Sequence, residues 1–361
     1  MSTVMKSPIQ KILFGSPGTG KSYTIEHTIL PVLGIDKESN PENVIKTVFH
    51  PEYTYGDFMG KLVPITKSGK VEYNFYEGHF LKALGQAYKN IQIMKPKAAG
   101  SINWNEVKNV ALVIDEINRG NSAAIFGICF QLLDRENTGW SSYKGNLTEI
   151  EFYKFIELIG VKISLVDGNL KFQFPGDSHY VHFDALKEKF IPLGINTETK
   201  AIMLPPNLSI LGTMNTSDNS IYFMDSAFKR RWEWEFVDWD NGSKIPDARY
   251  GKASNGNLNW KDEWQELVKR LNKFIKDHHD SVRGIEDKQI GYYFIKDKVV
   301  TAEQIRNKLM FFLWDSVFNR DKKPLLKLLK LEKAPGNLVT FGDFTKLHNE
   351  FVLNVMKYPI D

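Results

Sequence analysis

The sequence predicts an α/β protein whose parallel β-sheet is flanked by helices and carries a phosphate-binding loop. Strand-like apolar runs alternate with helical stretches from residue 11 to about residue 237, which is typical of a parallel sheet covered on both faces. The glycine-rich stretch GSPGTGKS, residues 15–22, follows the first apolar run and precedes a helical stretch at 23–30. Strand, glycine-rich loop and helix in this order are the context that a phosphate-binding loop requires.

The expected strands are short and apolar. They are residues 11–14, 44–49, 110–114, 208–213 and 232–237. Residues 241–246 (NGSKIP) then break the pattern, and residues 260–279 and 301–318 are expected helices. We therefore expect two domains: an α/β domain over residues 1–240 and a smaller, mainly helical domain over residues 241–361.

An insertion is expected at about residues 141–200, between two strands where a short connection would suffice. Over residues 161–174, apolar residues alternate with polar ones on both sides of an Asp167-Gly168 step. A two-residue turn at that step would pair the two halves and place all six apolar side chains on one face. With helices expected near 148–159 and 183–190, the insertion is predicted to be a small subdomain.

The residue types of the glycine-rich loop suit a triphosphate. Its glycines allow backbone turns that a β-carbon would forbid, so that consecutive N–H groups can point into one concavity. Lys21 can reach the β- and γ-phosphates, and the hydroxyl of Ser22 can ligate Mg²⁺. An ordinary glycine-rich turn is the alternative, and the strand and helix on either side disfavour it. The predicted nucleotide-binding residues are Gly15, Ser16, Pro17, Gly18, Thr19, Gly20, Lys21, Ser22, Tyr23 and Asp115.

Polar residues also end two strands further along the chain. Asp115 and Glu116 follow one apolar run, and Asn215 follows another. Because strand C-termini line the ligand crevice of a parallel sheet, Asp115 can hold Mg²⁺ through its water shell and Glu116 can polarise an attacking water. Asn215 can hydrogen-bond the γ-phosphate and that water. Ser22 and Asp115 are thus the predicted metal-site residues; chance acids at a strand end and a turn-forming asparagine are the alternatives.

Composition narrows the class of protein. Of 361 residues, 42% are apolar and 25% are charged, as in soluble globular proteins. Cys129 is the one cysteine, so no disulfide can form within the chain, and a cytoplasmic location without a membrane partner is expected. The net charge of +4 leaves no nucleic-acid footprint. The lysines of residues 323–333 could contact a nucleic-acid backbone, although a solvated helix face is favoured.

Five stretches together carry a resemblance to a known family. They are GSPGTGKS, then FHPEYTYGDF at 49–58, DEINRGN at 115–121, MNTSDNS at 214–220 followed by AFKRRW, and IGYYF at 290–294. Their order resembles that of the AAA+ P-loop nucleoside triphosphatases, and within them the McrB-like motor subunits of modification-dependent restriction systems. The resemblance covers most of the chain apart from about 140–200.

The resemblance implies a GTP-preferring ring motor, with a helical lid as its second domain. Members of the family are understood to form hexamers that bind nucleotide and Mg²⁺ between subunits. A McrC-like partner stimulates hydrolysis and carries the nuclease, and DNA is contacted through the assembled complex rather than by this chain alone. The site residues carry over onto Gly15 to Ser22 for the phosphates, Asp115 and Glu116 for metal and water, Asn215 for the sensor, and Arg230 or Arg231 for an arginine that acts on the neighbouring subunit.

The chain departs from the family in two places. The arginine of the family's MNT signature is Asn219 here, and only about ten residues precede the first expected strand, where the family has a DNA-reading domain. The N-K-x-D guanine motif is absent, so GTP in preference to ATP rests on the resemblance alone. A MoxR-like ATPase that remodels proteins and a nucleotide-gated scaffold remain alternatives, as does a helix-terminal charge cluster for the two arginines.

Overall fold

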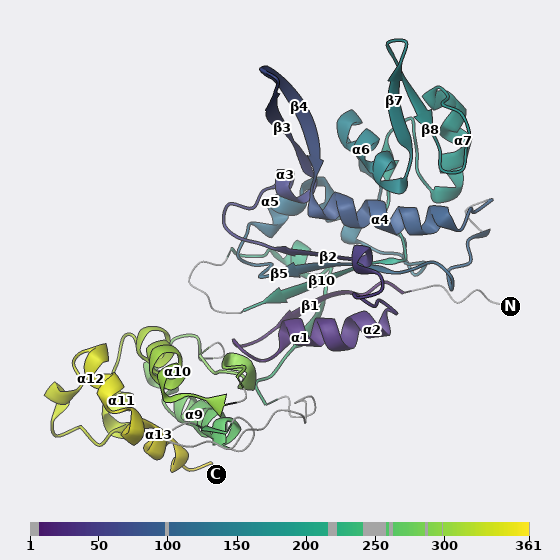
Figure 1. Ribbon diagram of the computed structural model, residues 1–361. Helices are drawn as coiled ribbons and strands as arrows, with labels where there is room; N and C mark the ends of the chain where they lie inside the picture. The colour runs from purple at the N-terminus through teal and green to yellow at the C-terminus, as the bar shows by residue number, and fades with distance from the viewer. Residues whose placement is uncertain are drawn as a thin grey trace. The chain divides into compact units, whose positions relative to one another are not determined.

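A five-stranded sheet with helices on both faces organises the first part of the chain in the computed structural model (Figure 1). In spatial order its strands are β11 (Glu233–Phe236), β1 (Gln10–Phe14), β10 (Leu208–Met214), β5 (Val110–Asp115) and β2 (Val44–Val48). Strands β10 and β2 both pair with β5 in parallel. The predicted α/β class is confirmed, and each expected strand lies within one residue of the observed one at both ends.

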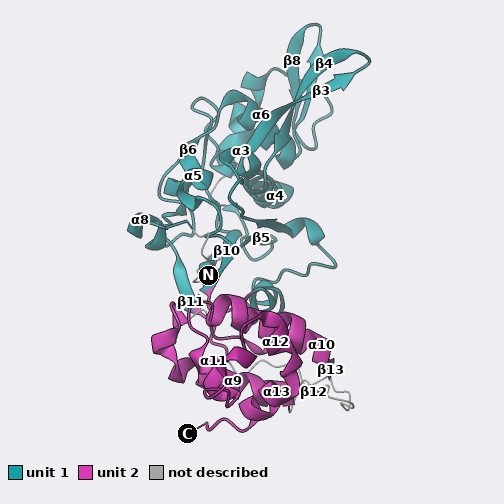
Figure 2. Cartoon of the chain, turned by 90° about the vertical axis from the view of Figure 1, so that its left-hand side faces the viewer, with its two compact units in different colours: residues 1–13, 22–214, 220–235 teal, residues 14–21, 215–219, 236–361 magenta. Residues whose placement is uncertain are grey.

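The structure describes residues 7–97, 101–215, 222–240, 258–259, 263–285, 288–297 and 299–360. The chain divides into two compact units (Figure 2). Unit 1 comprises residues 1–13, 22–214 and 220–235, and unit 2 comprises residues 14–21, 215–219 and 236–361. Asn219 and residues 241–246 of the predicted linker lie outside the described residues.

The central strands β5 and β10 are mostly apolar and almost fully buried because helices cover both faces of the sheet. The first five residues of β5 and the first six of β10 are buried, as expected for parallel strands covered on two sides. In Figure 1, α4 (His79–Ile93) lies on one face of the sheet. On the other face the predicted helix 23–30 is a helical run made of α1 (Lys21–Thr24), a π-turn and α2 (Leu30–Val32).

The predicted hairpin of the insertion is present as β7 (Lys162–Val166) and β8 (Asn169–Gln173). Leu165 pairs with Leu170 and Ile163 with Phe172, and the turn residues Asp167 and Gly168 have φ of 51° and 76°, as a two-residue turn requires. Burial of the apolar face is confined to the base of the hairpin. Near the tip, Leu165 and Leu170 are 68% and 44% exposed.

Helices flank this hairpin where the sequence predicts them. They are α6 (Glu149–Ile159) and a short run made of a 3₁₀ turn and α7 (Lys187–Phe190). A capping box between Thr148 and Glu151 starts α6. The buried side chains of α6 belong to the same hydrophobic cluster as the helices on the sheet, so the insertion shares the main core. Cys129 is fully buried in that cluster, and burial raises its pKa.

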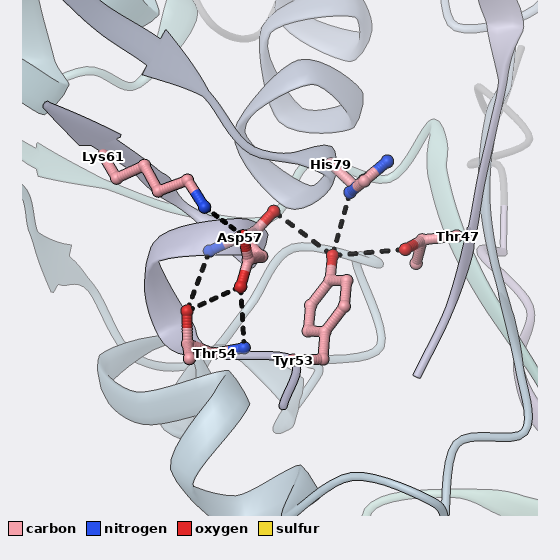
Figure 3. A network of polar contacts seen from close by, with 6 residues as sticks. All are labelled: Thr47, Tyr53, Thr54, Asp57, Lys61 and His79. Atoms are coloured by element: carbon pink, nitrogen blue, oxygen red, sulfur yellow. Dashed lines mark hydrogen bonds and ion pairs between the residues drawn. The ribbon is translucent and has the colours of Figure 1, made fainter. Parts of the chain in front are cut away.

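A second hairpin, formed by β3 (Gly60–Lys67) and β4 (Lys70–Glu77), was not predicted. In both views the two hairpins stand out on the same side of unit 1 (Figures 1 and 2). A polar network centred on Tyr53 holds the base of the β3–β4 hairpin (Figure 3). The Tyr53 hydroxyl lies 2.8 Å from His79 Nδ1 at the start of α4 and 3.2 Å from Thr47 Oγ1 on β2. Burial raises the pKa of Tyr53 to about 12, so the hydroxyl keeps its proton.

Unit 2 is largely helical and has its own apolar core. The predicted helix 260–279 is observed as α9 (Gln265–Asp277), and the predicted helix 301–318 as a run that starts with α10 (Ala302–Gln304) and continues through two π-turns to Val317. The remaining elements are β12 (Leu258–Asn259), β13 (Val299–Val300), α11 (Lys323–Leu328), α12 (Phe341–Lys346) and α13 (His348–Met356). Lysines 327, 330 and 333 are exposed, which both a solvated face and a nucleic-acid contact would require.

Candidate nucleotide-binding site

The glycine-rich loop of unit 2 adopts the backbone that its sequence predicts. Gly18 and Gly20 have φ of 78° and 91°, a region that residues with a β-carbon rarely adopt. The buried Lys21 donates from Nζ to the carbonyl oxygens of Gly15 and Ser16, at 2.9 and 2.8 Å. Its ammonium group is therefore held at the loop itself.

Asn215 reaches the same lysine from the end of β10. Its Oδ1 accepts a hydrogen bond of 2.8 Å from Lys21 Nζ, although the two residues are 194 positions apart. The structure thus brings together the predicted phosphate-binding lysine and the predicted sensor, which sequence spacing alone could not establish.

Another segment of unit 2 also contacts this loop. The backbone N–H of Gly291 donates to the carbonyl of Pro17 at 2.8 Å, and that of Tyr293 donates to Gly18 at 2.9 Å. A β-carbon on Gly291 would lie 2.2 Å from the Gly18 oxygen. The sequence analysis singled out residues 290–294 only as part of a resemblance. Their role against the loop was missed, because the isoleucine-glycine pair gives no local signal of a distant partner.

Replacing Gly291 by alanine is expected to push this segment off the loop, because its β-carbon would overlap the backbone of Gly18. Such overpacking typically costs about 1–3 kcal/mol, so the free energy of unfolding should fall by that amount and nucleotide affinity should fall with it. Denaturant unfolding and nucleotide titration measure both quantities. The matched control is Gly336→Ala, where a new β-carbon meets no atom within 4 Å; equal behaviour of the two variants would contradict the contact.

In unit 1, the two predicted metal-site residues touch directly. Ser22 Oγ donates to Asp115 Oδ1 at 3.2 Å, and Thr213 Oγ1 donates to the same oxygen at 2.8 Å. Thr213 stands on the neighbouring strand and fixes the carboxylate, a role that the sequence analysis did not assign. A hydroxyl and a carboxylate are oxygen donors of the kind that Mg²⁺ prefers. Among the described residues no group of three or more His, Cys, Asp or Glu side chains could hold a metal.

Glu116 follows Asp115 in a strained backbone conformation. Its φ is 55°, which costs a residue with a β-carbon roughly 1–2 kcal/mol. Thr213 holds the turn, because its carbonyl accepts from the N–H of Ile117 at 3.0 Å and its hydroxyl accepts from the N–H of Glu116 at 3.4 Å. Strain of this kind often accompanies functional sites.

Tyr23, the last predicted loop residue, is 37% exposed and its ring lies 4.1 Å from that of His27.

The two candidate arginines differ in their surroundings. Arg231 is 9% exposed, and its Nη2 and Nε lie 2.7 and 3.1 Å from Oδ2 of Asp134. Its guanidinium also lies 4.1 Å from the ring centre of Phe130. The side chain of Arg230, which follows α8 (Ser226–Lys229), is exposed. Sequence reasoning could not separate these neighbours, because the difference depends on contacts with residues about 100 positions earlier.

Comparison with known proteins points to restriction systems. No family model matches the chain. It is 29% identical to the Type II restriction enzyme BsuMI component YdiS of Bacillus subtilis, over 94% of this chain and 90% of that protein. It is 24% identical to the Type IV methyl-directed restriction enzyme EcoKMcrB subunit of Escherichia coli, over 66% of this chain and 37% of that subunit.

In the part of the chain that the structure describes, no helix has both the length and the apolar character needed to cross a membrane. The sheet, the glycine-rich loop and the two relatives agree with one another. The chain is therefore similar to restriction-system proteins, among them a McrB subunit, and its α/β fold is consistent with the AAA+ P-loop type.

Proposed function

We propose that this protein is the nucleoside-triphosphatase motor subunit of a McrBC-type restriction complex. In this proposal it prefers GTP, works as a ring of six copies, and drives DNA translocation for a McrC-like nuclease. The observation that carries the proposal is the end of the phosphate loop, where Lys21 contacts Asn215 and the next residue, Ser22, contacts Asp115. The likeness to restriction-system proteins supports the choice of complex.

The proposed chemistry assigns one task to each side chain. Lys21 exchanges the carbonyl oxygens of its own loop for phosphate oxygens, which accept stronger, charge-assisted hydrogen bonds. Ser22 and Asp115 hold Mg²⁺, which would neutralise charge on the phosphates. Glu116 accepts the proton of the attacking water, and Asn215 orients that water and the γ-phosphate.

Turnover with GTP and with ATP tests the proposed substrate. We expect a higher kcat/KM with GTP, and specific activity that rises with protein concentration as rings form. A clear preference for ATP would favour a MoxR-like remodelling ATPase instead. Tight nucleotide binding without measurable hydrolysis of either nucleotide would favour an assembly scaffold.

Replacing Glu116 by glutamine should leave nucleotide binding intact and slow hydrolysis by about 10²–10⁴-fold, because the amide is a poor base. Single-turnover hydrolysis and nucleotide titration measure the two effects separately. Glu188→Gln, at an exposed glutamate on α7, is the matched control and should behave as the unmodified protein. If the kcat of Glu116→Gln equals that of the wild-type protein, Glu116 is excluded as the water-activating group.

A further inference from the structure

The side chain of Arg231, which is 9% exposed, is held by its own chain through each of its three guanidinium nitrogens. Besides the two bonds to Asp134, its Nη1 donates to the carbonyl of Ala227 at 2.7 Å, and its own carbonyl accepts from the Gln10 side chain. Its guanidinium covers the Phe130 ring. An arginine engaged in this way would have to leave a carboxylate and an aromatic ring behind in order to reach another molecule.

Asp134 is itself fixed in place. It follows the 3₁₀ segment Gly127–Leu133, which carries Phe130, and its carbonyl accepts a hydrogen bond of 2.7 Å from the N–H of Ser142. The ring of Phe130 in turn stacks on Phe228 of α8, with centres 5.9 Å apart. The carboxylate of Asp134 and the ring of Phe130 therefore form a fixed binding surface for the guanidinium of Arg231.

The contacts that hold Arg231 also determine where the preceding residue, Arg230, lies. The N–H groups of Arg231 and Trp232 donate to the carbonyls of Phe228 and Lys229, each at 3.2 Å. Arg230 stands between this anchored turn and α8, and its side chain is exposed. With its backbone held on both sides, Arg230 has a fixed origin from which its side chain extends outward.

We propose that Asp134 is a positioning residue for hydrolysis in a neighbouring copy of the chain. It holds Arg231, and Arg231 fixes the turn that presents Arg230 to the nucleotide bound by the neighbour. This inference rests on the proposed ring-forming triphosphatase. It divides the arginine pair into an anchor, Arg231, and an acting residue, Arg230.

Asp134→Asn keeps the shape of the side chain and removes its charge. We expect about 10²-fold slower steady-state turnover, the loss typical of a misplaced catalytic group, with unchanged nucleotide affinity. Arg231→Lys retains a cation but loses the two-nitrogen contact with Asp134. It should likewise slow turnover and leave nucleotide affinity unchanged. Asp184→Asn, at an exposed aspartate 3.0 Å from Lys187, is the matched control and should leave turnover unchanged.

Mixing experiments separate a positioning role from a merely structural one. A mixed ring of Asp134→Asn and Lys21→Ala subunits should recover activity, because some interfaces then pair an intact loop with an intact arginine. A mixture of Asp134→Asn with Arg230→Ala should stay inactive, because both variants are defective on the same side of the interface. Should Asp134 act on its own subunit's nucleotide instead, the two results would be exchanged, and the inference would be wrong.

A reference mixture keeps the two proposals apart. Arg230→Ala mixed with Lys21→Ala should recover activity if an arginine acts between subunits. If that mixture stays inactive although mixed rings form, the proposed intersubunit mechanism fails. Suppose instead that the reference mixture recovers activity, but Asp134→Asn recovers it with Arg230→Ala and not with Lys21→Ala, or has wild-type turnover by itself. In that case only the role of Asp134 is overturned. If Asp134→Asn fails to fold, Arg231→Lys replaces it in the same mixtures, and the results are interpreted in the same way.

Discussion

Replacing Lys21 by alanine is expected to abolish productive nucleotide binding and, with it, turnover. Lys21 is the cation of the glycine-rich loop, and its Nζ already lies within 2.9 Å of two loop carbonyls and of the Asn215 oxygen. Without it, the β- and γ-phosphates lose a charge-assisted partner, and these are among the strongest hydrogen bonds in proteins. Asn215 also loses the contact that joins it to the loop.

Titration with a fluorescent nucleotide and steady-state turnover measure this effect. Lys37→Ala is the matched control. Lys37 also has a described partner, since its Nζ lies 3.2 Å from Oε2 of Glu26, but its side chain is 46% exposed. Its loss should change neither quantity, since exposed ion pairs contribute little. Unchanged affinity and turnover in Lys21→Ala would remove the phosphate-loop assignment.

Replacing Arg230 by alanine should lower kcat by about 10³–10⁵-fold, the range known for arginines that act on phosphoryl transfer from a neighbouring subunit or protein. Nucleotide affinity and the free energy of unfolding should stay unchanged, because the side chain is exposed. Lys229→Ala, which removes a cation one residue away, is the control; Lys229 lies 5.1 Å from the centre of the Phe223 ring and should matter little for turnover.

Arg231→Ala should differ from Arg230→Ala in its effect on stability. Its loss strands the Asp134 carboxylate, which is 28% exposed, and uncovers Phe130. We therefore expect a lower melting temperature in Arg231→Ala but not in Arg230→Ala. If Arg230→Ala keeps full kcat in assembled protein, the two residues form no more than a charge cluster at the end of α8.

The strands and the phosphate loop were predictable because their signals are local. A buried parallel strand is a run of consecutive apolar residues, as in β5 and β10, and a glycine-rich loop between a strand and a helix has few other uses. The β7–β8 hairpin was predictable for the same reason, since the Asp-Gly step and the alternation on either side specify its register.

The β3–β4 hairpin was missed because only one of its two strands carries such a signal: residues 71–75 (VEYNF) alternate, whereas residues 62–65 (LVPI) are consecutive apolar residues. It is only partly covered, so apolar residues occur on both of its faces and several are exposed, among them Tyr73 at 69% and Val71 at 60%. Alternation of apolar and polar residues reports a strand with one buried face. Residues 62–65 of β3 do not show that pattern, and alternation in β4 alone does not identify a hairpin.

The sequence by itself determined the class of the sheet, the place of its strands and the candidate residues for a nucleotide site, because all of these follow from patterns within about ten neighbouring positions. Tertiary structure alone decided how those residues are supported: Asn215 on Lys21, Thr213 on Asp115, Gly291 on the loop, and Asp134 on Arg231 rather than Arg230. Each of these contacts joins segments about 100 or more positions apart. Their geometry depends on how strands and helices pack, which local patterns do not encode.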